Sequence, residues 1–412
     1  MNLLMLTKTY PFGSGEAFIE NEITVFSQHY DNVYIIACDV PKDEKKVRKL
    51  PHNVKVYRID SINKNKDRLS GASHYLLSNE PDIKAERKAC KGFMQKLFLS
   101  YFEAKSRRIF KTILQSGILD TAASFPYVLY SYWLFVTARV GTLISEQFRP
   151  VYMFTRAHRY DLYADKNKLG YLPFRRLLLS RYNEIFPCSD DGTHYLCDKY
   201  PEFSDKISTS FLGTIDHGDG RLSSDGIFRI YSCSRVVSVK RVERIAEALK
   251  LLDGKNLKIQ WTHIGGGEQL EAVKNLAQNS LKSIEYQFLG DTPNQKVLEI
   301  YSNDPVDLFI NVSSSEGLPV SIMEAVSFGV PVIGTDVGGT SEIVFNGLTG
   351  LLIPENFTNE ELSEKIEYFY SIHETEKYQK YRKDCREFWE EHFQAIKNYE
   401  KLCGHIEEKC SG

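Results

Sequence analysis

The sequence predicts an α/β fold of two Rossmann-like βαβ domains, each built on a mostly parallel sheet. The chain has 412 residues, more than one hydrophobic core usually serves, so two domains are expected. Short apolar runs alternate with longer amphipathic segments from end to end, as in repeated βα units. Residues 213–226 contain four glycines and separate two such series. Because open α/β sheets bind ligands outside the carboxyl ends of their strands, we expect both edges to face a central cleft.

The strands are expected where the apolar runs occur. Before the linker the predicted strands are 2–7, 33–38, 54–58, 128–132, 151–155 and 184–187. After it they are 227–234, 258–264, 285–289, 307–311, 331–335 and 350–353. The tail from about 360 is charged and is predicted to be helical.

A basic amphipathic helix is expected over residues 86–116, with apolar residues such as Phe93, Met94 and Phe102 among lysines and arginines. Such a helix can lie on anionic lipid. Packing against its own domain is the more common use of the pattern.

No membrane-spanning segment is expected. Residues 1–7 are too short for a signal peptide and lack its basic flank, so they predict a first buried strand. The longest apolar stretch, 127–144, is interrupted by polar residues and a glycine, which favours a strand and a helix over a membrane span.

The composition, 42% hydrophobic and 26% charged, excludes disordered, fibrous and disulfide-scaffold proteins. The net charge of −2 conceals an asymmetry between the two halves. Residues 1–216 hold 31 Lys+Arg against 24 Asp+Glu, a net +7, and the rest holds 21 against 30, a net −9. The basic half indicates either an anionic partner, such as a phosphate-bearing acceptor or a membrane surface, or merely a solvated surface. The eight cysteines form no Cys-x-x-Cys pair, which indicates reduced thiols and a cytoplasmic location.

The densest candidate site follows the predicted strand 307–311. A loop of small residues leads to Glu316 and Gly317, and a helix is expected to start around Pro319. The free backbone N–H groups at such a helix start attract an anion, and a diphosphate is the usual one. Glu316 and Glu324 could then accept hydrogen bonds from sugar hydroxyls. The alternative is a glutamate that favours the helix dipole and an ordinary surface glutamate.

The spacing of these two glutamates resembles the Glu-x7-Glu pattern of retaining GT-B glycosyltransferases. The surrounding motifs EGLPV, MEA, GVPVIGTDVGG, EIV and NGLTGLLIP, in this order, are similar to family 4 of those enzymes. The close resemblance covers residues 228–355 and is patchy before them. It implies a GT-B fold in which Glu324 binds the ribose hydroxyls. It also implies that the donor sugar is held by Glu316 and the backbone of Gly317, Leu318, Pro319 and Val320.

Arg235 and Lys240 follow the predicted strand 227–234. Cations fixed beside a departing diphosphate stabilise the charge that grows on it in the transition state. Ordinary surface basicity is the alternative, but the spacing resembles the family's Arg-x4-Lys pair. Cys233-Ser234 and Arg241 stand where many members of the family have glycine.

Further glycine turns follow other strands. Gly265 and Gly266 resemble the family's turn that approaches the nucleotide, and Leu289 lies in a segment resembling the one that reads the base. In the first half, Gly13 and Gly15 resemble the glycine loop under the donor sugar, with Glu16 beside the acceptor.

His158 follows the predicted strand 151–155 and resembles the family's histidine that faces the donor sugar. A lone histidine is more often structural than catalytic. Arg159 stands in place of the family's usual glycine, and we expect this cation to touch an anionic acceptor.

Three motifs are missing from the sequence: Asp-x-Asp, the phosphate loop of NTPases, and a histidine pair with metal-ligand spacing. We therefore expect neither a bound metal nor a cofactor besides the nucleotide-sugar donor. Nucleic acid is not an expected partner.

Together these features predict a retaining, metal-independent hexosyltransferase. Its donor would be a UDP- or GDP-sugar and its acceptor a saccharide or a lipid-diphosphate-linked saccharide. The setting would be capsule, O-antigen or exopolysaccharide assembly, in the cytoplasm or peripherally at the inner membrane surface. The acceptor domain is expected at 1–215, with a helix at about 386–412 crossing back, and the donor domain at 216–385. The alternatives are a nucleotide-sugar 2-epimerase or a phosphorylase on the same fold, and a non-catalytic partner of another glycosyltransferase.

Overall fold

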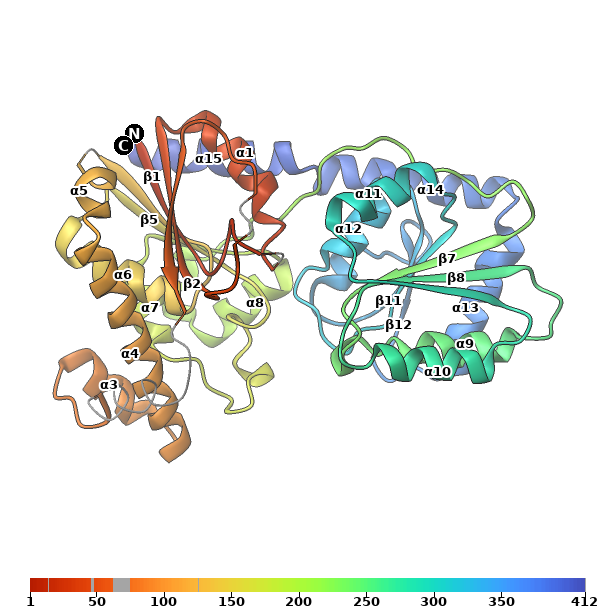
Figure 1. The fold of residues 1–412 in the computed structure, drawn as a ribbon, viewed down its shortest axis with the longest axis horizontal. Helices are drawn as coiled ribbons and strands as arrows, with labels where there is room; N and C mark the ends of the chain where they lie inside the picture. Colours follow the sequence, from red (N-terminus) through yellow and green to blue (C-terminus); the bar gives the residue numbers. More distant parts are fainter. Residues whose placement is uncertain (14, 46–47, 62–74, 125, 412) are drawn as a thin grey trace. The chain divides into compact units, whose positions relative to one another are not determined.

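The computed structural model describes residues 1–13, 15–45, 48–61, 75–124 and 126–411. The chain divides into a first unit, Met1–Ser210 with Tyr399–Gly412, and a second unit, Phe211–Asn398 (Figure 1). The sequence placed these divisions near 215 and 385. Residues 386–398 pack in the second unit because Arg386 donates to the carbonyl of Ser327 (2.6 Å) and Trp389 Nε1 donates to Thr214 Oγ1 (2.7 Å).

The first unit contains a six-stranded parallel sheet in the order β3-β2-β1-β4-β5-β6. The strands are β1 Asn2–Thr7, β2 Asn32–Val40, β3 Val54–Asp60, β4 Tyr127–Ser131, β5 Tyr152–Ala157 and β6 Glu184–Pro187. All six predicted strands of this half are confirmed, with ends shifted by a residue or two. The buried runs of β1, β4 and β5 lie in the centre of the sheet, where both faces are covered.

The second unit repeats this plan in the order β12-β11-β10-β7-β8-β9, again all parallel. Its strands are β7 Phe228–Cys233, β8 Ile259–Ile264, β9 Glu285–Gly290, β10 Leu308–Asn311, β11 Val332–Thr335 and β12 Gly350–Ile353. These six predictions are also confirmed.

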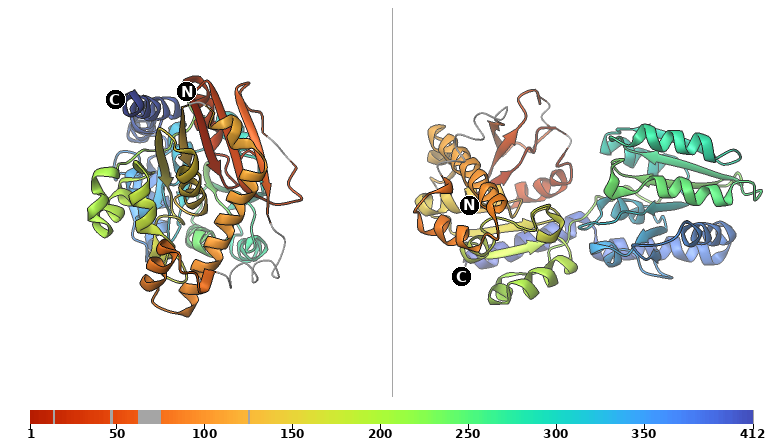
Figure 2. Two further views of the ribbon diagram at one scale, coloured as in Figure 1. Left: turned by 90° about the vertical axis from the view of Figure 1, so that its left-hand side faces the viewer. Right: turned by 90° about the horizontal axis from the view of Figure 1, so that it is seen from below.

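Helices cover both faces of each sheet (Figures 1 and 2). In the first unit they are α1 Ile19–His29, α3 Pro81–Ala89, α4 Phe93–Gln115, α5 Ile118–Ala122, α6 Val136–Phe148, α7 Arg175–Arg181 and α8 Asp190–Lys199. In the second they are α9 Glu243–Leu252, α10 Leu270–Ser280, α11 Asn294–Asn303, α12 Val320–Ser327, α13 Asn359–Ile372 and α14 Glu376–His392. The last helix, α15 (Ala395–Ser411), begins in the second unit and ends in the first.

Strand order reverses once in each sheet, between β1 and β4 and between β7 and β10. At such a point the connections of the two neighbouring strands leave in opposite directions, so a crevice opens at their carboxyl ends. The loops after β7 and β10 are therefore neighbours in space, although Lys240 and Glu316 are 76 residues apart in the chain.

The predicted basic helix corresponds to α3 and α4, separated by a short break at Cys90–Gly92. The apolar face of this segment packs against its own unit. It includes the residues of α4 that are buried in the core, namely Leu99, Phe102, Ile109 and Ile113. Within the described ranges, no helix has both the length and the hydrophobicity that a membrane span needs. All eight cysteines are described, and none forms a disulfide.

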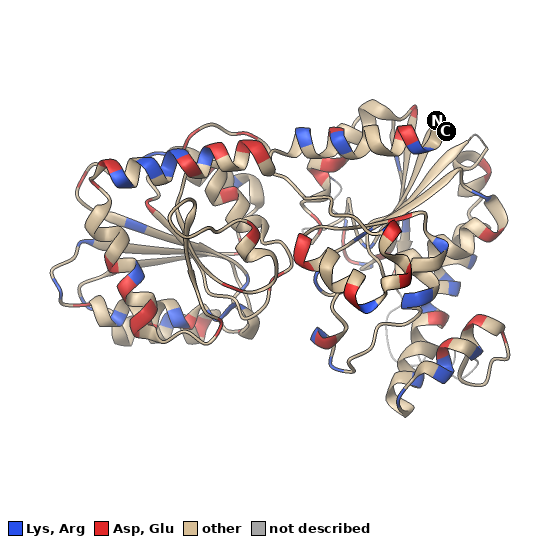
Figure 3. Cartoon of the chain, turned by 180° about the vertical axis from the view of Figure 1, so that it is seen from behind, with Lys and Arg blue, Asp and Glu red and all other residues tan. Residues whose placement is uncertain are grey.

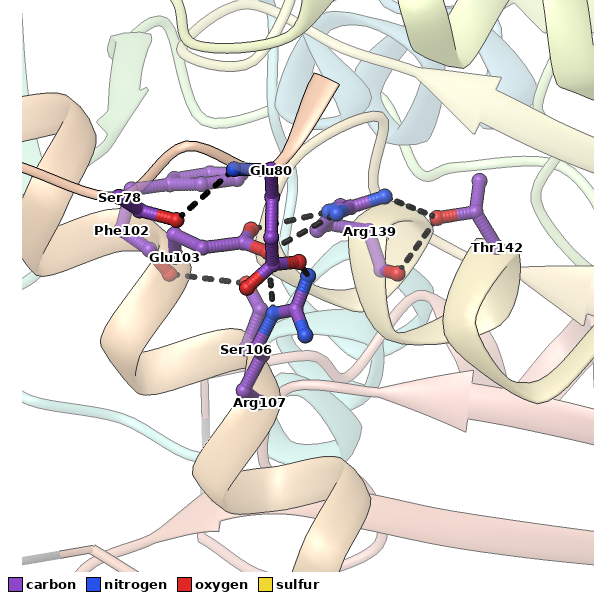
Figure 4. Close-up of polar contacts among 8 residues, drawn as sticks. All are labelled: Ser78, Glu80, Phe102, Glu103, Ser106, Arg107, Arg139 and Thr142. Atoms are coloured by element: carbon purple, nitrogen blue, oxygen red, sulfur yellow. Dashed lines mark hydrogen bonds and ion pairs between the residues drawn. The ribbon is translucent and has the colours of Figure 1, made fainter. Parts of the chain in front are cut away.

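A buried charge network joins α4 to α6 (Figure 4). Glu103 is fully buried and accepts two hydrogen bonds from Arg139, at 2.9 and 2.8 Å, and one from Arg107 Nε at 2.6 Å. Arg107 also pairs with Glu80, at the N-cap of α3. Burial alone would raise the pKa of Glu103, but the bonds and charges of the two arginines hold it below its usual value.

Replacing Glu103 by Ala is expected to lower the free energy of unfolding at pH 7 by about 3–5 kcal/mol, because it leaves Arg139 buried without its counter-charge. Because the folded pKa of Glu103 is depressed, the contribution is complete above the unfolded pKa and is lost as pH falls through the folded value. Urea unfolding at several pH values measures both effects.

The matched control is Lys166→Ala, which removes an exposed cation of the same unit and should change stability by less than about 0.5 kcal/mol. The double variant Glu103→Leu, Arg139→Met should lose less stability than Glu103→Ala. An equal or larger loss in the double variant would contradict the electrostatic explanation.

Candidate functional site

The centre of the candidate site is an ion pair at the strand reversal of the second sheet. Lys240, in the loop after β7, donates to Glu316 Oε1 at 2.6 Å, and Asn311 Nδ2, from the end of β10, donates to the same oxygen at 3.1 Å. Burial alone would raise the pKa of Glu316, but the charge and hydrogen bond of Lys240, helped by Asn311, hold it below its usual value. Glu316 is therefore a carboxylate at neutral pH although it is only 7% exposed.

Arg235, the other predicted cation, is placed differently. It directly follows β7, and its side chain is exposed. Within the described part of the chain its guanidinium forms no hydrogen bond or ion pair, so its charge is available to a ligand. The structure thus brings Lys240 to Glu316 and leaves Arg235 free.

The loop that carries Glu316 depends on Gly338 and Gly339. Gly338 has φ +52°, and a Cβ there would lie 2.2 Å from the carbonyl oxygen of Glu316. The N–H of Gly339 donates to the carbonyl of Gly317 at 2.7 Å. Both glycines are part of the sequence resemblance, and the close approach at Gly338 explains why no side chain fits at that position.

Backbone N–H groups are exposed to a ligand at the start of α12. The helix begins at Val320 after Pro319, and no side chain caps it. Among the described residues, the N–H groups of Gly317 and Leu318 have no hydrogen-bond acceptor. Unpaired N–H groups beside a helix N-terminus favour an anionic ligand.

Glu324 lies on α12 and is only 6% exposed. The alternative interpretation of the sequence, an ordinary surface glutamate, does not apply to it. Asn294 Nδ2 donates to its Oε1 at 2.7 Å. Burial raises the pKa of Glu324 to about 7, and this single hydrogen bond offsets only part of the effect. Glu324 is therefore poised near ionisation at neutral pH.

The glycine turn after β8 supports the Arg235 loop. Gly265 and Gly267 have φ of +133° and +149°, and a Cβ at Gly265 would lie 1.9 Å from the carbonyl oxygen of Ser234. Gly266 accepts from Val236 N at 2.7 Å and donates to Asp291 Oδ1 at 3.0 Å. Leu289, predicted to lie near the base, is half-buried in β9.

Arg241 has a role that the sequence did not reveal. It has φ +49°, which explains why glycine suits this position in similar sequences. Its guanidinium donates to the carbonyls of Val312 (2.8 Å), Ser313 (3.2 Å) and Glu355 (2.7 Å), so it ties the loop after β7 to the loop after β10. A cation in a glycine position was the signal that could have suggested this anchoring.

In the first unit, Glu16 is already engaged by protein groups. Its carboxylate accepts from the N–H groups of Lys8 (3.2 Å), Thr9 (2.6 Å) and Tyr10 (2.6 Å), and from Trp133 Nε1. We therefore assign it to fixing the loop after β1 and the indole of Trp133. Gly13 has φ +69°, and Gly15 is exposed in the same loop.

His158 is buried after β5, with its ring 4.8 Å from that of Tyr132 and 4.4 Å from that of Trp133. Neither ring nitrogen has a hydrogen-bond partner within the described residues. Burial and then the charge of Arg156 lower the pKa of His158, so the imidazole is neutral at pH 7. Arg159, next in the chain, is half-exposed.

No group of three or more His, Cys, Asp or Glu in the described residues is arranged to hold a metal ion.

Comparison with known proteins identifies the second unit. Residues 221–388 match the family of glycosyl transferases group 1. The matched segment contains the Lys240–Glu316 pair, Arg235, Glu324 and the N-terminus of α12.

Two relatives illustrate the match. The O-antigen biosynthesis glycosyltransferase WbnH of Escherichia coli is 29% identical over 171 residues, 42% of this chain and 46% of WbnH. The chain thus spans about half the length of such relatives. The amylovoran biosynthesis glycosyltransferase AmsK of Erwinia amylovora is 23% identical over 384 residues, 86% of this chain and 87% of AmsK.

Two solved structures show the same fold. The lipopolysaccharide outer core galactosyltransferase WaaB matches with a TM-score of 0.67 and 14% identity, over 99% of this chain and 100% of WaaB. HepE of Anabaena in complex with UDP-glucose matches with a TM-score of 0.65 and 14% identity, over 99% and 100%. The predicted GT-B fold is confirmed.

Replacing Glu324 by Gln is expected to raise the free energy of unfolding at pH 8 by about 1–3 kcal/mol. Because the folded pKa of about 7 lies above that of an unfolded glutamate, the native state loses stability as pH rises between about 4.5 and 7. Gln removes this loss, and its side-chain oxygen can still accept a hydrogen bond from Asn294. Unfolding by denaturant from pH 4.5 to 8 tests the sign.

Glu364→Gln, on the exposed face of α13, is the matched control and should change stability by less than about 0.5 kcal/mol. A Glu324→Gln protein less stable than the wild type at pH 8 would refute the raised pKa.

Proposed function

We propose that the protein is a retaining, metal-independent glycosyltransferase. It moves a hexose from a UDP- or GDP-sugar to a saccharide or lipid-diphosphate-linked saccharide during capsule, O-antigen or exopolysaccharide assembly. The observation that carries the proposal is the Lys240–Glu316 pair beside the uncapped start of α12 and the unpaired Arg235. This arrangement suits a diphosphate and a sugar at one edge of a sheet.

In the proposed reaction, Arg235, Lys240 and the α12 N-terminus stabilise the charge that develops on the leaving diphosphate. The bond between the anomeric carbon and the phosphate oxygen breaks, and the anomeric centre becomes oxocarbenium-like. The acceptor oxygen attacks from the same face, and its proton passes to the departing phosphate oxygen. Configuration is retained, and no separate base is required.

The remaining residues bind and orient. Glu316 accepts a hydrogen bond from a hydroxyl of the donor sugar, with the backbone from Gly317 to Val320 beside it. Glu324 accepts hydrogen bonds from the ribose hydroxyls. Gly265 and Gly266 let the backbone approach the nucleotide, and Leu289 lies near the base. Neutral His158 contributes a hydrogen bond to the donor sugar. The names of WbnH and AmsK, and the UDP-glucose in the HepE structure, support a nucleotide-sugar donor and a polysaccharide setting.

Nucleotide release from a panel of UDP- and GDP-sugars, in EDTA and with lysate-derived acceptors, tests this function. Release should survive EDTA, require acceptor and retain the anomeric configuration. Glu316→Gln should lower kcat/KM by about 10²-fold or more, by analogy with removing one transition-state donor elsewhere. Glu364→Gln should keep full activity.

The other outcomes separate the alternatives. Loss of release in EDTA contradicts metal independence. Turnover without acceptor indicates epimerase or hydrolytic chemistry, and turnover that requires inorganic phosphate indicates a phosphorylase. Nucleotide binding without turnover on any acceptor favours a non-catalytic partner.

We also propose that the first unit associates peripherally with an anionic membrane through the tip formed by α3 and α4. Leu77, Phe93 and Met94 are 84%, 69% and 58% exposed, the highest values among the large hydrophobic residues of the described chain. The same part of the chain carries the exposed lysines Lys84, Lys88, Lys91 and Lys96, and Figure 3 shows in blue where lysine and arginine lie along the ribbon. Exposed apolar side chains together with cations suit the surface of an anionic bilayer.

Changing Leu77, Phe93 and Met94 together to Ser should weaken binding to phosphatidylglycerol-containing vesicles by about 10-fold or more in a flotation assay. Binding should also weaken with added salt, and pure phosphatidylcholine vesicles should bind poorly. In the matched control Val151, Leu222 and Leu251, which are also exposed, are changed together to Ser. This variant should bind the vesicles as the wild type does. Equal binding of both triple variants would refute the tip as the membrane contact.

A further inference from the structure

A second cluster of charges lies at the carboxyl edge of the first sheet, where α4 passes the ends of β1 and β2. Lys105 Nζ of α4 pairs with Asp39 Oδ2 at 2.5 Å, and the N–H of Asp39 donates to the carbonyl of Lys8 at 2.8 Å. Lys105 thus neutralises Asp39, whose pKa it holds below the usual value although burial opposes this.

The side chains of two further cations at this edge form no hydrogen bond in the described residues. Arg108 lies three residues after Lys105 on α4, is half-buried, and has a guanidinium without a hydrogen-bond partner in the described residues. Lys8 is exposed, and its ammonium likewise has no partner there. Both act electrostatically on Asp39, so both lie near it. Arg108 and Lys8 share Asp39 with Lys105, which holds its carboxylate in an ion pair. A half-buried cation whose nearby carboxylate is already engaged is costly in the free protein and favours an anionic ligand.

A rigid aromatic ring lies at the same edge. Tyr160 is 42% exposed, yet its ring centroid is 4.8 Å from that of Trp133 and 6.0 Å, edge-on, from that of Phe135. Phe135 in turn packs 4.9 Å from Phe102 of α4. Asp39 is close enough to act electrostatically on Tyr160.

These contacts give the ring of Tyr160 a firm backing and an open side. Glu16 fixes the indole of Trp133 behind it. A large aromatic ring held in this way buries the apolar C–H face of a ligand at little conformational cost.

We infer that this edge is a subsite for an anionic sugar, a pyranose carrying a phosphate or a carboxylate. The sugar ring lies on Tyr160, and its anionic group lies between Arg108 and Lys8. The inference rests on the proposed function and narrows it, because it makes the acceptor an anionic saccharide.

The test uses the full-length protein labelled with 5-fluorotryptophan. Of the three tryptophans, Trp133 is in the first unit, while Trp261 and Trp389 are in the second. The ¹⁹F signal of Trp133, assigned with Trp133→Phe, therefore reports the first unit. It is followed without nucleotide sugar, because Trp133 also packs against His158, which the proposed function places at the donor sugar. The probes are α-D-glucose 1-phosphate, D-glucuronate, inorganic phosphate and methyl α-D-glucoside.

At low salt, at least one anionic sugar should shift the Trp133 signal with an affinity about 10-fold or more above those of inorganic phosphate and the neutral glucoside. Arg108→Gln should remove most of that preference, and Tyr160→Ala should weaken sugar binding while leaving inorganic phosphate unchanged. Lys199→Gln, at an exposed position at the end of α8, is the matched control and should have no effect. The comparison of glucose 1-phosphate with glucuronate identifies the anion.

The inference is overturned if the neutral glucoside binds as tightly as both anionic sugars, if no probe shifts Trp133, or if Arg108→Gln keeps the full preference. Donor turnover tests the proposed function separately. An enzyme that transfers to neutral acceptors and tolerates Arg108→Gln would keep the proposed function and lose this subsite. A protein that shows no turnover but still binds anionic sugars near Trp133 would keep this subsite and lose the proposed function.

Discussion

The reversal of strand order between β7 and β10 is the constraint on which the second unit depends. Because parallel strands need long crossover connections, residues that end neighbouring strands can be far apart in the chain and still meet at one edge. The reversal brings Lys240 to Glu316 at 2.6 Å, and Arg241 then fixes the two loops through three carbonyl groups. The glycines at 265, 267 and 338 matter because they let these loops approach without a Cβ in the way.

The buried and half-buried ionisable residues discussed above fall into two groups. Glu103 and Glu16 are fully engaged by arginines or by backbone and indole N–H groups, so they stabilise local structure. Glu324, Arg108 and His158 are buried or half-buried with few partners or none in the described residues. Such groups weaken the folded state, and incomplete pairing of this kind is typical of sites that bind ligands.

Much of the fold was predictable from the sequence. All twelve strands were found from alternating apolar runs, because a buried parallel strand needs a continuous apolar segment whatever its neighbours are. The start of a helix near Pro319 was also predictable, because it depends only on residues close together in the sequence. The domain boundaries were less exact, since Arg386 and Trp389 hold residues 386–398 to the second unit by contacts with residues far away in the sequence.

The sequence by itself determined the two βα series, the helix that follows Glu316 and the motifs that resemble a known family, because each depends on residue type and short spacing. The tertiary structure alone decided that Lys240 pairs with Glu316 while Arg235 stays free, and that Glu16 holds Trp133. It also decided that Phe93 and Met94 are exposed on a helix whose other apolar residues are mostly packed in the core. It also decided that Glu324 is buried deeply enough to raise its pKa to about 7. The physical reason is that pairing and burial depend on which distant segments become neighbours, and the order of strands in the sheet decides that.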